Sequence, residues 1–542
     1  MASRRPLLLT LTIFVITAVI VTLPAFSGNF LKLTMDGGIH LSRLESVFGA
    51  FSVGKLPPLV NFIGLGNHVN AFNGMYPWFS TALFFTLPRL ILGNSMQSMF
   101  IGYILLNLVT MLNAYLLVKE LSSDNIVRIF SAIFYGVNAY HLTLLFSREA
   151  LGEAVGYTFA PLVILGCLRI WNRRNKGPIY LAIGMGMIAN SHVISLFLIF
   201  LLLIMLEVVR IILKKVDLVE IKSFFIGGLI TILIGSYSLF NIMKITIANN
   251  MHTPNKGLAP IIPSKMLVAV FDNSIQDDRH IFNIGLIGLV LILFLCVELF
   301  KKSKVGDWTP WASLAVILFI CSTSWLQLEK TRATDSVFGN IQFLGRILAL
   351  IVLLMTVAVT IYVEEQKSYN KYMLIGTSIL LVLMGISSIS QYHLRKNDDP
   401  IRYYVSNSHD FSKIAYTQPH GKGDYALVEV KNGGMLTAKA NTRIENYKST
   451  FDSANFNVNA RNGITTVPIN MYKNVDYHLY VDGKKKKFQS NKKILTINLK
   501  KGNHKIKLVS KAGYSEYINM FVSCVSLIGC GLFIILVEPR KH

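Results

Sequence analysis

The sequence predicts an α-helical polytopic membrane protein with about twelve transmembrane helices and one antiparallel β domain before the last helix. Three observations support this fold class. The 542 residues are 52% hydrophobic with a mean hydropathy of +0.49, which is too apolar for a soluble protein. Many apolar runs are long enough to cross a bilayer. One long stretch, 392–516, instead alternates short apolar runs with turn pairs.

The net charge of +24 narrows the choice of partners. In a membrane protein, basic loop residues set the topology and meet anionic lipid head groups. We therefore expect membrane lipid, and not nucleic acid, as a partner. The five cysteines lie inside apolar runs without a CxxC pair, so they predict neither a disulfide framework nor a metal site.

The chain begins with a basic pair and an apolar run. Arg4-Arg5-Pro6 precedes the run 7–26, which is long enough to span and lacks a convincing cleavage site, so we expect an uncleaved first helix with a cytoplasmic N-terminus. A large first external loop, 27–96, follows. It contains an amphipathic stretch and a short apolar piece that we interpret as re-entrant or interfacial. These two pieces are 38–51 and 77–92.

Apolar length and basic flanks define the remaining spans. Arg173-Arg174 and Lys214-Lys215 mark cytoplasmic ends, and the resulting path places both termini in the cytoplasm of a multi-pass cell-membrane protein. The predicted domains are a transmembrane domain, an extracellular β domain and a last helix with its tail: 1–391, 392–516 and 517–542. The predicted spans after the first are 97–118, 126–146, 154–171, 178–190, 193–213, 223–243, 281–300, 309–326, 343–363, 372–391 and 517–537.

The segment 392–516 has the pattern of a small antiparallel sandwich. Short alternating runs are separated by Asn-Gly, Asp-Gly and Gly-Asn turn pairs. Its Lys484–Lys487 run is either a solvated hairpin tip or a weak attractor of anionic wall polymer or lipid. The predicted strands are 425–430, 435–440, 463–469, 477–481, 493–499 and 504–509, and the turn pairs are Asn432-Gly433, Asn462-Gly463, Asp482-Gly483 and Gly502-Asn503.

Ionisable residues are rare inside the predicted spans and gather at their external ends. An ion-coupled transporter usually carries such residues near the bilayer midplane. Their distribution therefore favours chemistry at the outer membrane face. The candidates are Asp36, His40, Arg43, Arg148, Glu149, Glu153, His192, the cluster at 272–280, Arg332 and Arg346.

Taken one by one, these residues leave more than one role open. Asp36 is a loop acid, the N-cap of the amphipathic stretch that follows it, or a catalytic base. His40 stands at i+4 on the same helical face, where it either orients Asp36 or lies at the membrane interface. Glu153 either favours the positive N-terminus of a helix, with Arg148 as its ion-pair partner, or takes part in a site.

Several motifs occur in an order that resembles bacterial YfhO-like multi-spanning membrane proteins, which belong to the C-type glycosyltransferase (GT-C) superfamily. The first three motifs match the first external loop of that family, the next two match its Arg-(Gly/Glu)-Ala-x-x-Glu and Gln-Phe-Pro-Trp-Arg elements, and the last two match its terminal β domain. In order, the motifs are Asp36-x-x-x-His40-x-x-Arg43, Gly54-Lys55-Leu56-Pro57-Pro58, Phe72-Asn73-Gly74-Met75-Tyr76-Pro77, Ser147–Ala154, Asn340–Arg346, Tyr480–Lys484 and Lys501–His504.

The chain departs from the family pattern at three points. Leu344-Gly345 replaces the usual Pro-Trp pair, Gly37-Gly38 follows the aspartate, and there is no Asp-x-Asp sequence. The last departure leaves any requirement for a divalent cation open, and no metal-ligating residues are assigned.

The resemblance implies a GT-C type fold and an inverting glycosyltransferase. The donor would be a polyprenyl-phosphate-linked sugar, such as undecaprenyl-phosphate-sugar, and the acceptor a cell-envelope glycan, polysaccharide or teichoic acid on the outer face. By this analogy Asp36 is the general base, and Glu153 and His40 position the acceptor or orient that base. Arg346, and after it Arg148, would bind the donor phosphate.

The resemblance also implies substrate-positioning roles for Arg43, Glu149 and His192. Two other functions remain as alternatives, a transporter or flippase of a lipid-linked glycan and a non-catalytic envelope-assembly protein that binds through its β domain. The enzymatic hypothesis requires Arg148, Glu153 and Arg346 to converge on Asp36 across four separate loops.

Overall fold

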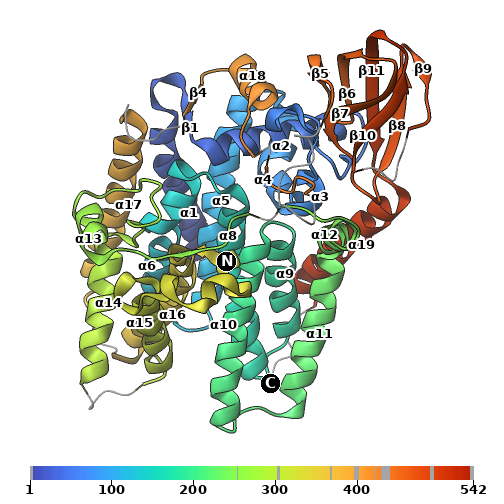
Figure 1. Cartoon of the computed structure of the whole chain (residues 1–542). Helices are drawn as coiled ribbons and strands as arrows, with labels where there is room; N and C mark the ends of the chain where they lie inside the picture. Colours follow the sequence, from blue (N-terminus) through green and yellow to red (C-terminus); the bar gives the residue numbers. More distant parts are fainter. Residues whose placement is uncertain are drawn as a thin grey trace.

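The computed structural model describes residues 4–252, 254–301, 306–366, 369–395, 402–421, 423–428, 440–488 and 493–537. It is a bundle of helices with antiparallel sheets at one end (Figure 1). In this described part, seven helices are long and apolar enough to cross a membrane, and two bent helix pairs raise the number to nine. The seven are Leu7–Asn29 (α1, Arg4–Thr22, with the turn after it), α5 (Ser95–Val118), α8 (Leu151–Trp171), α10 (Val193–Ile212), Leu344–Gln366 (containing α16, Leu348–Gln366), α17 (Lys371–Leu394) and α19 (Tyr514–Leu536).

This composition is that of a polytopic membrane protein, but the number of twelve spans stays a prediction. The other three predicted spans are present as shorter apolar helices, α9 (Gly177–Ala189), α14 (Gly285–Phe300) and α15 (Thr309–Ser322). At 1.5 Å per residue, the 13 residues of α9 extend roughly 20 Å, which is less than the thickness of a bilayer core.

Two predicted straight spans are broken. The 126–146 span consists of α6 (Asn125–Gly136) and the helical segment Ala139–Ser147, which meet at 43°. Asn138 causes the break, because its side chain accepts a hydrogen bond from His141 N and starts a new helix, α7 (Ala139–Leu142). The 223–243 span consists of α11 (Leu218–Ile234) and α12 (Ser236–Ala248), which meet at 72° around Gly235.

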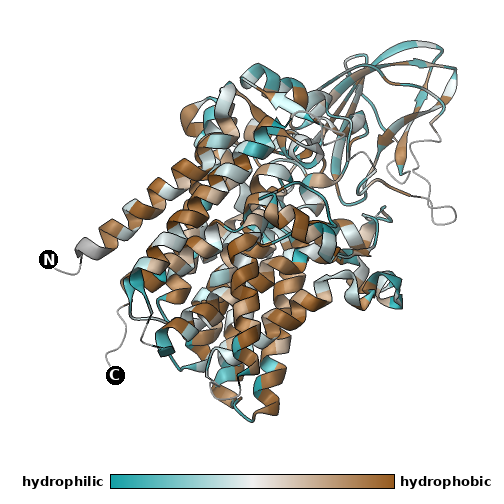
Figure 2. Ribbon diagram, turned by 90° about the vertical axis from the view of Figure 1, so that its left-hand side faces the viewer, coloured by the Kyte–Doolittle hydropathy of each residue, from teal (hydrophilic) through white to brown (hydrophobic). Residues whose placement is uncertain are grey.

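Basic residues mark the end of the bundle that lies away from the sheets. The connection between α10 and α11 carries Lys214 and Lys215 and lies at the end opposite the sheets (Figure 1). Arg173, after α8, pairs with Asp217 of that connection, so both turns belong to the same end. Figure 2 shows apolar residues along the helices and polar residues at the turns and in the sheets. Which of the two ends is cytoplasmic stays a prediction from the basic flanks.

The segment 27–96, predicted as the first external loop, forms a helical layer between the bundle and the sheets (Figure 1). Its helices are α2 (Met35–Phe51), α3 (Phe72–Met75) and α4 (Phe79–Leu92), and its short strand β1 (Leu31–Leu33) precedes α2. β1 pairs antiparallel with β4 (Tyr403–Val405), and α18 (Ser408–Thr417) packs on α2. The beginning of the predicted β domain is therefore attached to the first loop.

The residues from 445 to 511 form two antiparallel sheets. The five-stranded sheet has the order β5-β6-β11-β8-β9, and the two-stranded sheet joins β10 and β7. Apolar side chains of β6, β7, β8, β10 and β11 pack in one shared core. The strands are β5 (Glu445–Ser449), β6 (Ser453–Ala460), β7 (Gly463–Asn470), β8 (Asp476–Val481), β9 (Lys484–Lys485), β10 (Ile494–Leu499) and β11 (Gly502–Lys511).

Four of the six predicted strands match β7, β8, β10 and β11. Asp482 and Gly483 both have positive φ, as expected for a two-residue hairpin turn between β8 and β9. The predicted strand 435–440 and the Asn432-Gly433 turn lie outside the described residues, apart from residue 440. Of the 425–430 run, Leu427 forms a bridge with Met251 instead of a hairpin strand.

Candidate functional site

Glu153 joins two arginines that lie far apart in the sequence. Its Oε2 atom lies 3.0 Å from Arg148 Nη1 and 3.1 Å from Arg346 Nε. Glu153 is in the first turn of α8, Arg148 lies three residues before the start of that helix, and Arg346 lies in the 3₁₀ turn Leu344–Ile347 before α16. All three are buried, with at most 7% of each residue exposed. The ion pair between Arg148 and Glu153 is thus present, and Arg346 completes a buried triad.

Two aromatic residues hold this triad in place. The Phe343 ring lies 4.5 Å from Arg148 Cζ and 4.4 Å from Arg346 Cζ, so both guanidinium groups lie against one ring. The Tyr140 hydroxyl donates a 2.7 Å hydrogen bond to Glu153 Oε1. Phe343 is placed by the short parallel pairing of β3 (Gln342–Phe343) with β2 (Leu258–Ala259), which brings the 254–280 loop beside the site.

Asp36 faces this triad from the first turn of α2. The N-cap of α2 is Thr34, so the interpretation of Asp36 as the N-cap is wrong. Burial raises the pKa of the Asp36 carboxyl above its ordinary value, although the charges of Arg148 and Arg346 act in the opposite direction. Within the part of the chain that the structure describes, the Asp36 side chain makes no hydrogen bond or ion pair. The structure therefore brings Asp36, Arg148, Glu153 and Arg346 together.

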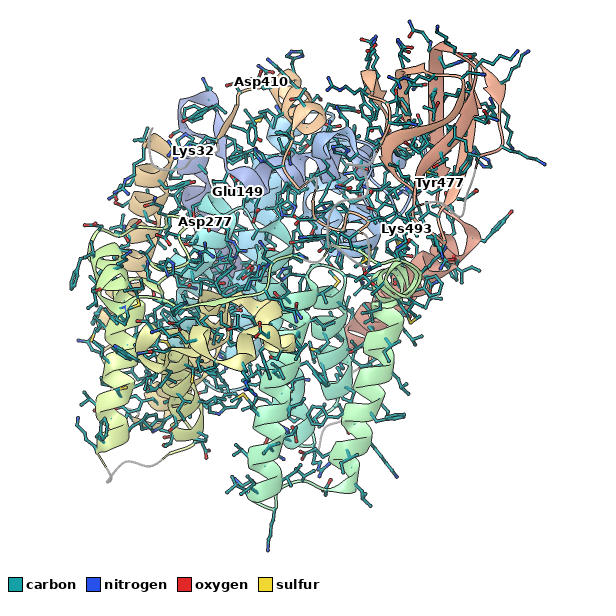
Figure 3. The ribbon with its side chains drawn as sticks, viewed as in Figure 1. Lys32, Glu149, Asp277, Asp410, Tyr477 and Lys493 are labelled. Carbon is teal, nitrogen blue, oxygen red and sulfur yellow. The ribbon has the colours of Figure 1, made fainter. Side chains whose placement is uncertain are left out.

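Glu149 supports the backbone at Asp36 instead of pairing with a cation. Its Oε2 accepts a 2.8 Å hydrogen bond from Thr34 N, and its residue is only 1% exposed. Burial raises the pKa of Glu149 well above its ordinary value. Gly37 makes this contact possible, because a Cβ atom there would lie 2.0 Å from Glu149 Oε2. The glycine that departs from the family pattern is therefore needed for the local packing. Figure 3 places Glu149, Asp277 and Lys32 on the side of the molecule that carries the sheets.

We expect replacement of Glu149 with glutamine to change the free energy of unfolding by less than about 1.5 kcal/mol, because the neutral acid and the amide both offer a carbonyl to Thr34 N. Glu149→Ala removes the acceptor and should cost about 1–3 kcal/mol. Unfolding of the detergent-solubilised protein, followed by heat or denaturant, measures both. Equal destabilisation by the two changes would show that Glu149 acts as a charged group.

His40 and Arg43 fix the orientation of α2. Arg43 Nη1 lies 2.9 Å from His40 Nδ1, and Arg43 Nη2 donates to the carbonyl oxygens of Tyr76 and Pro77. Because a guanidinium group only donates, Nδ1 accepts and the proton of the neutral imidazole is on Nε2. Burial and the charge of Arg43 lower the pKa of His40 well below its ordinary value. In the described part of the chain, His40 makes its side-chain hydrogen bond to Arg43 and not to Asp36.

Tyr76 lies between the two histidines of the site. Its ring centroid is 5.7 Å from that of His40 and 5.8 Å from that of His192. Gly152 leaves room for this ring, because a Cβ atom there would lie 2.7 Å from the Tyr76 hydroxyl. Burial raises the pKa of Tyr76 to about 12, and the charges of Asp36 and Glu153 act in the same direction. His192 caps α10 by accepting a hydrogen bond from Ser195 N, and burial lowers its pKa to about 3.

The segment after α18 adds a further carboxylate, Asp424, which no sequence motif indicated. Burial raises the pKa of the Asp424 carboxyl above its ordinary value, and the charge of Asp36 acts in the same direction. The neighbouring Tyr425 packs its ring 5.2 Å from that of Phe72. Backbone hydrogen bonds between Tyr425 N and His252 O, and between His252 N and Ala426 O, attach this segment to the 250–252 strand-like stretch. Only the neighbouring 425–430 run gave a signal in the sequence, and it predicted a strand.

The site residues come from six parts of the chain. In the described ranges, no group of three or more His, Cys, Asp or Glu side chains is arranged as a metal site. Of the predicted residues, Arg332 lies in a separate, largely exposed 3₁₀ turn, Arg332–Asp335, and does not join the cluster. No protein-family model matches the chain, and no curated protein matches it significantly.

Proposed function

We propose that this protein is a membrane glycosyltransferase that transfers a sugar from a polyprenyl-phosphate donor to a cell-envelope glycan or teichoic acid, with Asp36 as the general base. The observation that carries the proposal is the buried triad of Arg148, Glu153 and Arg346 beside the unpartnered carboxylate of Asp36. A carboxylate that can accept a proton and a pair of cations that can stabilise a leaving phosphate are the two needs of such a transfer.

The proposed reaction is a single inverting displacement. The acceptor hydroxyl gives its proton to Asp36 while its oxygen attacks the anomeric carbon of the donor. The bond between that carbon and the phosphate oxygen breaks, and the polyprenyl phosphate leaves with the electron pair. Arg148 and Arg346 stabilise the negative charge that develops on the phosphate. Glu153 holds the two guanidinium groups side by side, and Phe343 limits their movement.

Tyr76, His40 and His192 form one wall of the proposed acceptor site. The aromatic faces suit a sugar ring, and the Nε2 hydrogen of the neutral His40 is a donor for a hydroxyl group. Arg43 acts through His40 and Tyr76 and is a positioning residue. Asp424 lies near Asp36 on the opposite segment, where it can accept a hydrogen bond from an acceptor hydroxyl.

The finer architecture belongs to the same proposal. We propose twelve spans of the GT-C kind, an extracellular β-sandwich and cytoplasmic termini. Three short apolar helices at predicted positions and the shared core of the two sheets support it. Cysteines introduced at Asn503 and at Lys214 test the topology in intact cells. A membrane-impermeant reagent should label position 503 directly and position 214 only after permeabilisation. The reverse result would exclude the proposed topology.

The pH dependence of transfer should follow the titration of Asp36. A base is active only when ionised, so the rate falls as the pH drops through its pKa. Since burial raises that pKa, we expect kcat/KM to decline at a higher pH than an exposed aspartate, with a pKa of about 4, would give. Initial rates between pH 4 and 8 measure this. An acid limb at or below the ordinary value would contradict the placement of Asp36 as a buried base.

The deciding experiment uses the full chain in proteoliposomes with undecaprenyl-phosphate-linked hexoses and N-acetylhexosamines as donors. Release of free undecaprenyl phosphate together with sugar on an added envelope glycan supports the proposal. Movement of the intact donor across the bilayer without bond cleavage would instead favour a flippase. The glycan composition of a deletion strain then identifies the sugar and the acceptor.

A further inference from the structure

The outer face of the five-stranded sheet carries an open basic groove of about 580 Å³. Alternation along β11 produces it, because Ile506 and Leu508 point into the core while the lysines between and beyond them point outward. Lys505, Lys507 and Lys511 are exposed, and their side chains make no hydrogen bond or ion pair with the described part of the chain. Three ammonium groups on one strand are thus free to bind an external anion.

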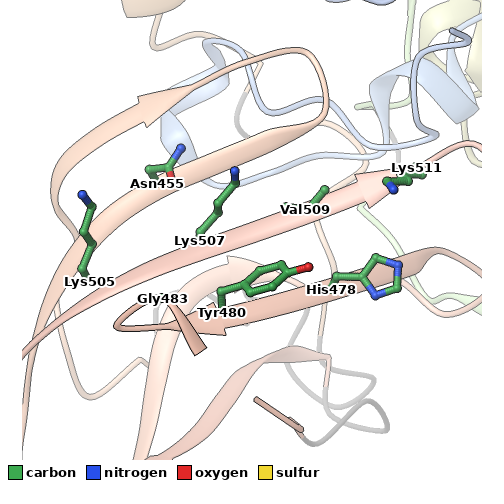
Figure 4. Close-up of a pocket in the computed structure, with 8 residues that line it drawn as sticks. All are labelled: Asn455, His478, Tyr480, Gly483, Lys505, Lys507, Val509 and Lys511. Carbon is green, nitrogen blue, oxygen red and sulfur yellow. The ribbon is translucent and has the colours of Figure 1, made fainter. Parts of the chain in front are cut away.

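The strands on both sides add polar and aromatic groups to the groove. Lys507 stands opposite Asn455 of β6 and Tyr480 of β8. Figure 4 shows Lys507 between the Asn455 amide and the Tyr480 ring, with His478 further along β8. These groups suit a carbohydrate chain. The flat ring can pack against the apolar face of a sugar, the amide can bond to its hydroxyls, and the ammonium groups can bind its anionic substituents.

The charge on this face is predominantly positive. The strand registers place Lys448 of β5 and Lys485 of β9 on the same side as the β11 lysines. The acidic residues on this face are Glu445, Asp476 and Asp482. Asp476 lies 3.4 Å from His478 Nε2 and Asp482 lies 2.7 Å from His504 Nδ1, so two of the three acids already have a local partner. The lysines of the groove remain available.

The direction of β11 distinguishes a polymer from a lipid surface as the ligand. β11 leads directly into α19, a candidate membrane span, and Lys511 is three residues before the first residue of that helix. Lys505 lies six residues further from the helix, roughly 20 Å along the strand. The strand rises away from α19 (Figure 1). Lipid head groups can therefore reach the Lys511 end only, whereas a chain that runs along β11 contacts all three lysines.

We propose that this groove binds an anionic carbohydrate polymer whose negative groups repeat along the chain. Outward residues on a strand recur at about 6.8 Å, so Lys507 stands one such interval from Lys505 and Lys511 two intervals beyond Lys507. All three can therefore meet charges that repeat along the polymer. Several weak contacts together keep the polymer attached to the sheet. Attachment raises the effective concentration of the polymer at the proposed transfer site. Binding of the polymer to the groove does not depend on the proposed function. Only the role of this polymer as the sugar acceptor rests on it.

The test measures binding of polygalacturonate, a chain of sugar rings that each carry one carboxylate, to the full chain in nanodiscs of neutral phosphatidylcholine. We expect the triple variant Lys505→Gln, Lys507→Gln, Lys511→Gln to weaken binding at least about tenfold, and Tyr480→Ala to weaken it severalfold at a salt concentration that screens the charges. The matched control replaces Lys473, Lys500 and Lys501 with glutamine. These three lysines are also exposed but lie outside the groove, so the net charge changes equally.

Three outcomes would overturn the proposal. An equal loss of binding in the control variant would show attraction by net charge alone. Loss of polymer binding when phosphatidylglycerol is added to the nanodiscs would show that lipid head groups occupy the groove. Unchanged binding in the triple variant would exclude the groove itself, and the single change Lys507→Gln repeats this test if the triple variant does not fold. Failure of the groove proposal can be told apart from failure of the proposed sugar transfer. The triple variant should still transfer sugar to a short soluble acceptor, and only its KM for the polymer should rise.

Discussion

Replacement of Asp36 with asparagine should lower kcat for sugar transfer by about 10²- to 10⁴-fold. The amide has nearly the shape of the carboxylate but cannot accept the proton of the acceptor hydroxyl. Since Asp36 has no hydrogen-bond or ion-pair partner in the described part of the chain, the change should leave the fold intact. Transfer from purified undecaprenyl-phosphate-sugar, measured under single-turnover conditions, gives the chemical step directly.

Glu149→Gln is the matched control for this experiment. Both residues are acidic, both lie at the start of α2 or against it, and both receive the same chemical change. We expect the Glu149 variant to keep near-normal kcat. If Asp36→Asn transfers sugar at the normal rate, Asp36 is not the base, and Asp424 becomes the residue to test with the same substitution.

Replacement of Glu153 with glutamine should have the largest effect on stability. It leaves Arg148 and Arg346 buried against the same Phe343 ring without their common carboxylate, and breaking a buried ion pair on one side costs about 3–5 kcal/mol. The change also lets the guanidinium groups separate, so donor binding should weaken. Thermal unfolding in detergent and the KM for the donor report the two effects.

The double variant Arg148→Gln, Glu153→Gln distinguishes charge from packing. It removes one cation together with the anion, so we expect it to be more stable than Glu153→Gln alone. A double variant that is less stable by the sum of both single changes would mean that the two residues contribute independently, and that the triad does not act as a unit.

The candidate site was partly predictable from its residues. Arg148 and Glu153 are five residues apart at the start of one helix, so their ion pair follows from local geometry. Arg346 is 193 residues from Glu153, and no periodicity links them; only the order of motifs suggested it. Tyr140 and Asp424 carried no sequence signal, because an aromatic residue in an apolar run and an acidic residue in a turn have many ordinary uses. Phe343 belongs to the 340–346 motif, but nothing in that motif indicated that its ring would contact two arginines.

The fold, like the site, was predictable from the sequence only in part. Long apolar runs identified the helices, but Asn138 inside the 126–146 run starts a new helix by capping, and length alone could not reveal that bend. β6 was missed although its apolar residues alternate regularly. Asparagine fills its outward positions, and asparagine is rare in strands, so the pattern resembles a loop.

The pairing of β1 with β4 has a consequence for biosynthesis. Lys32 donates to the carbonyl oxygens of Tyr392 and Arg395, which the ribosome adds 360 or more residues later. Helices can enter the membrane one at a time, but the segment that carries Asp36 gains its strand partner only when most of the polypeptide has been made. A chain truncated before β4 would therefore lack the complete proposed site.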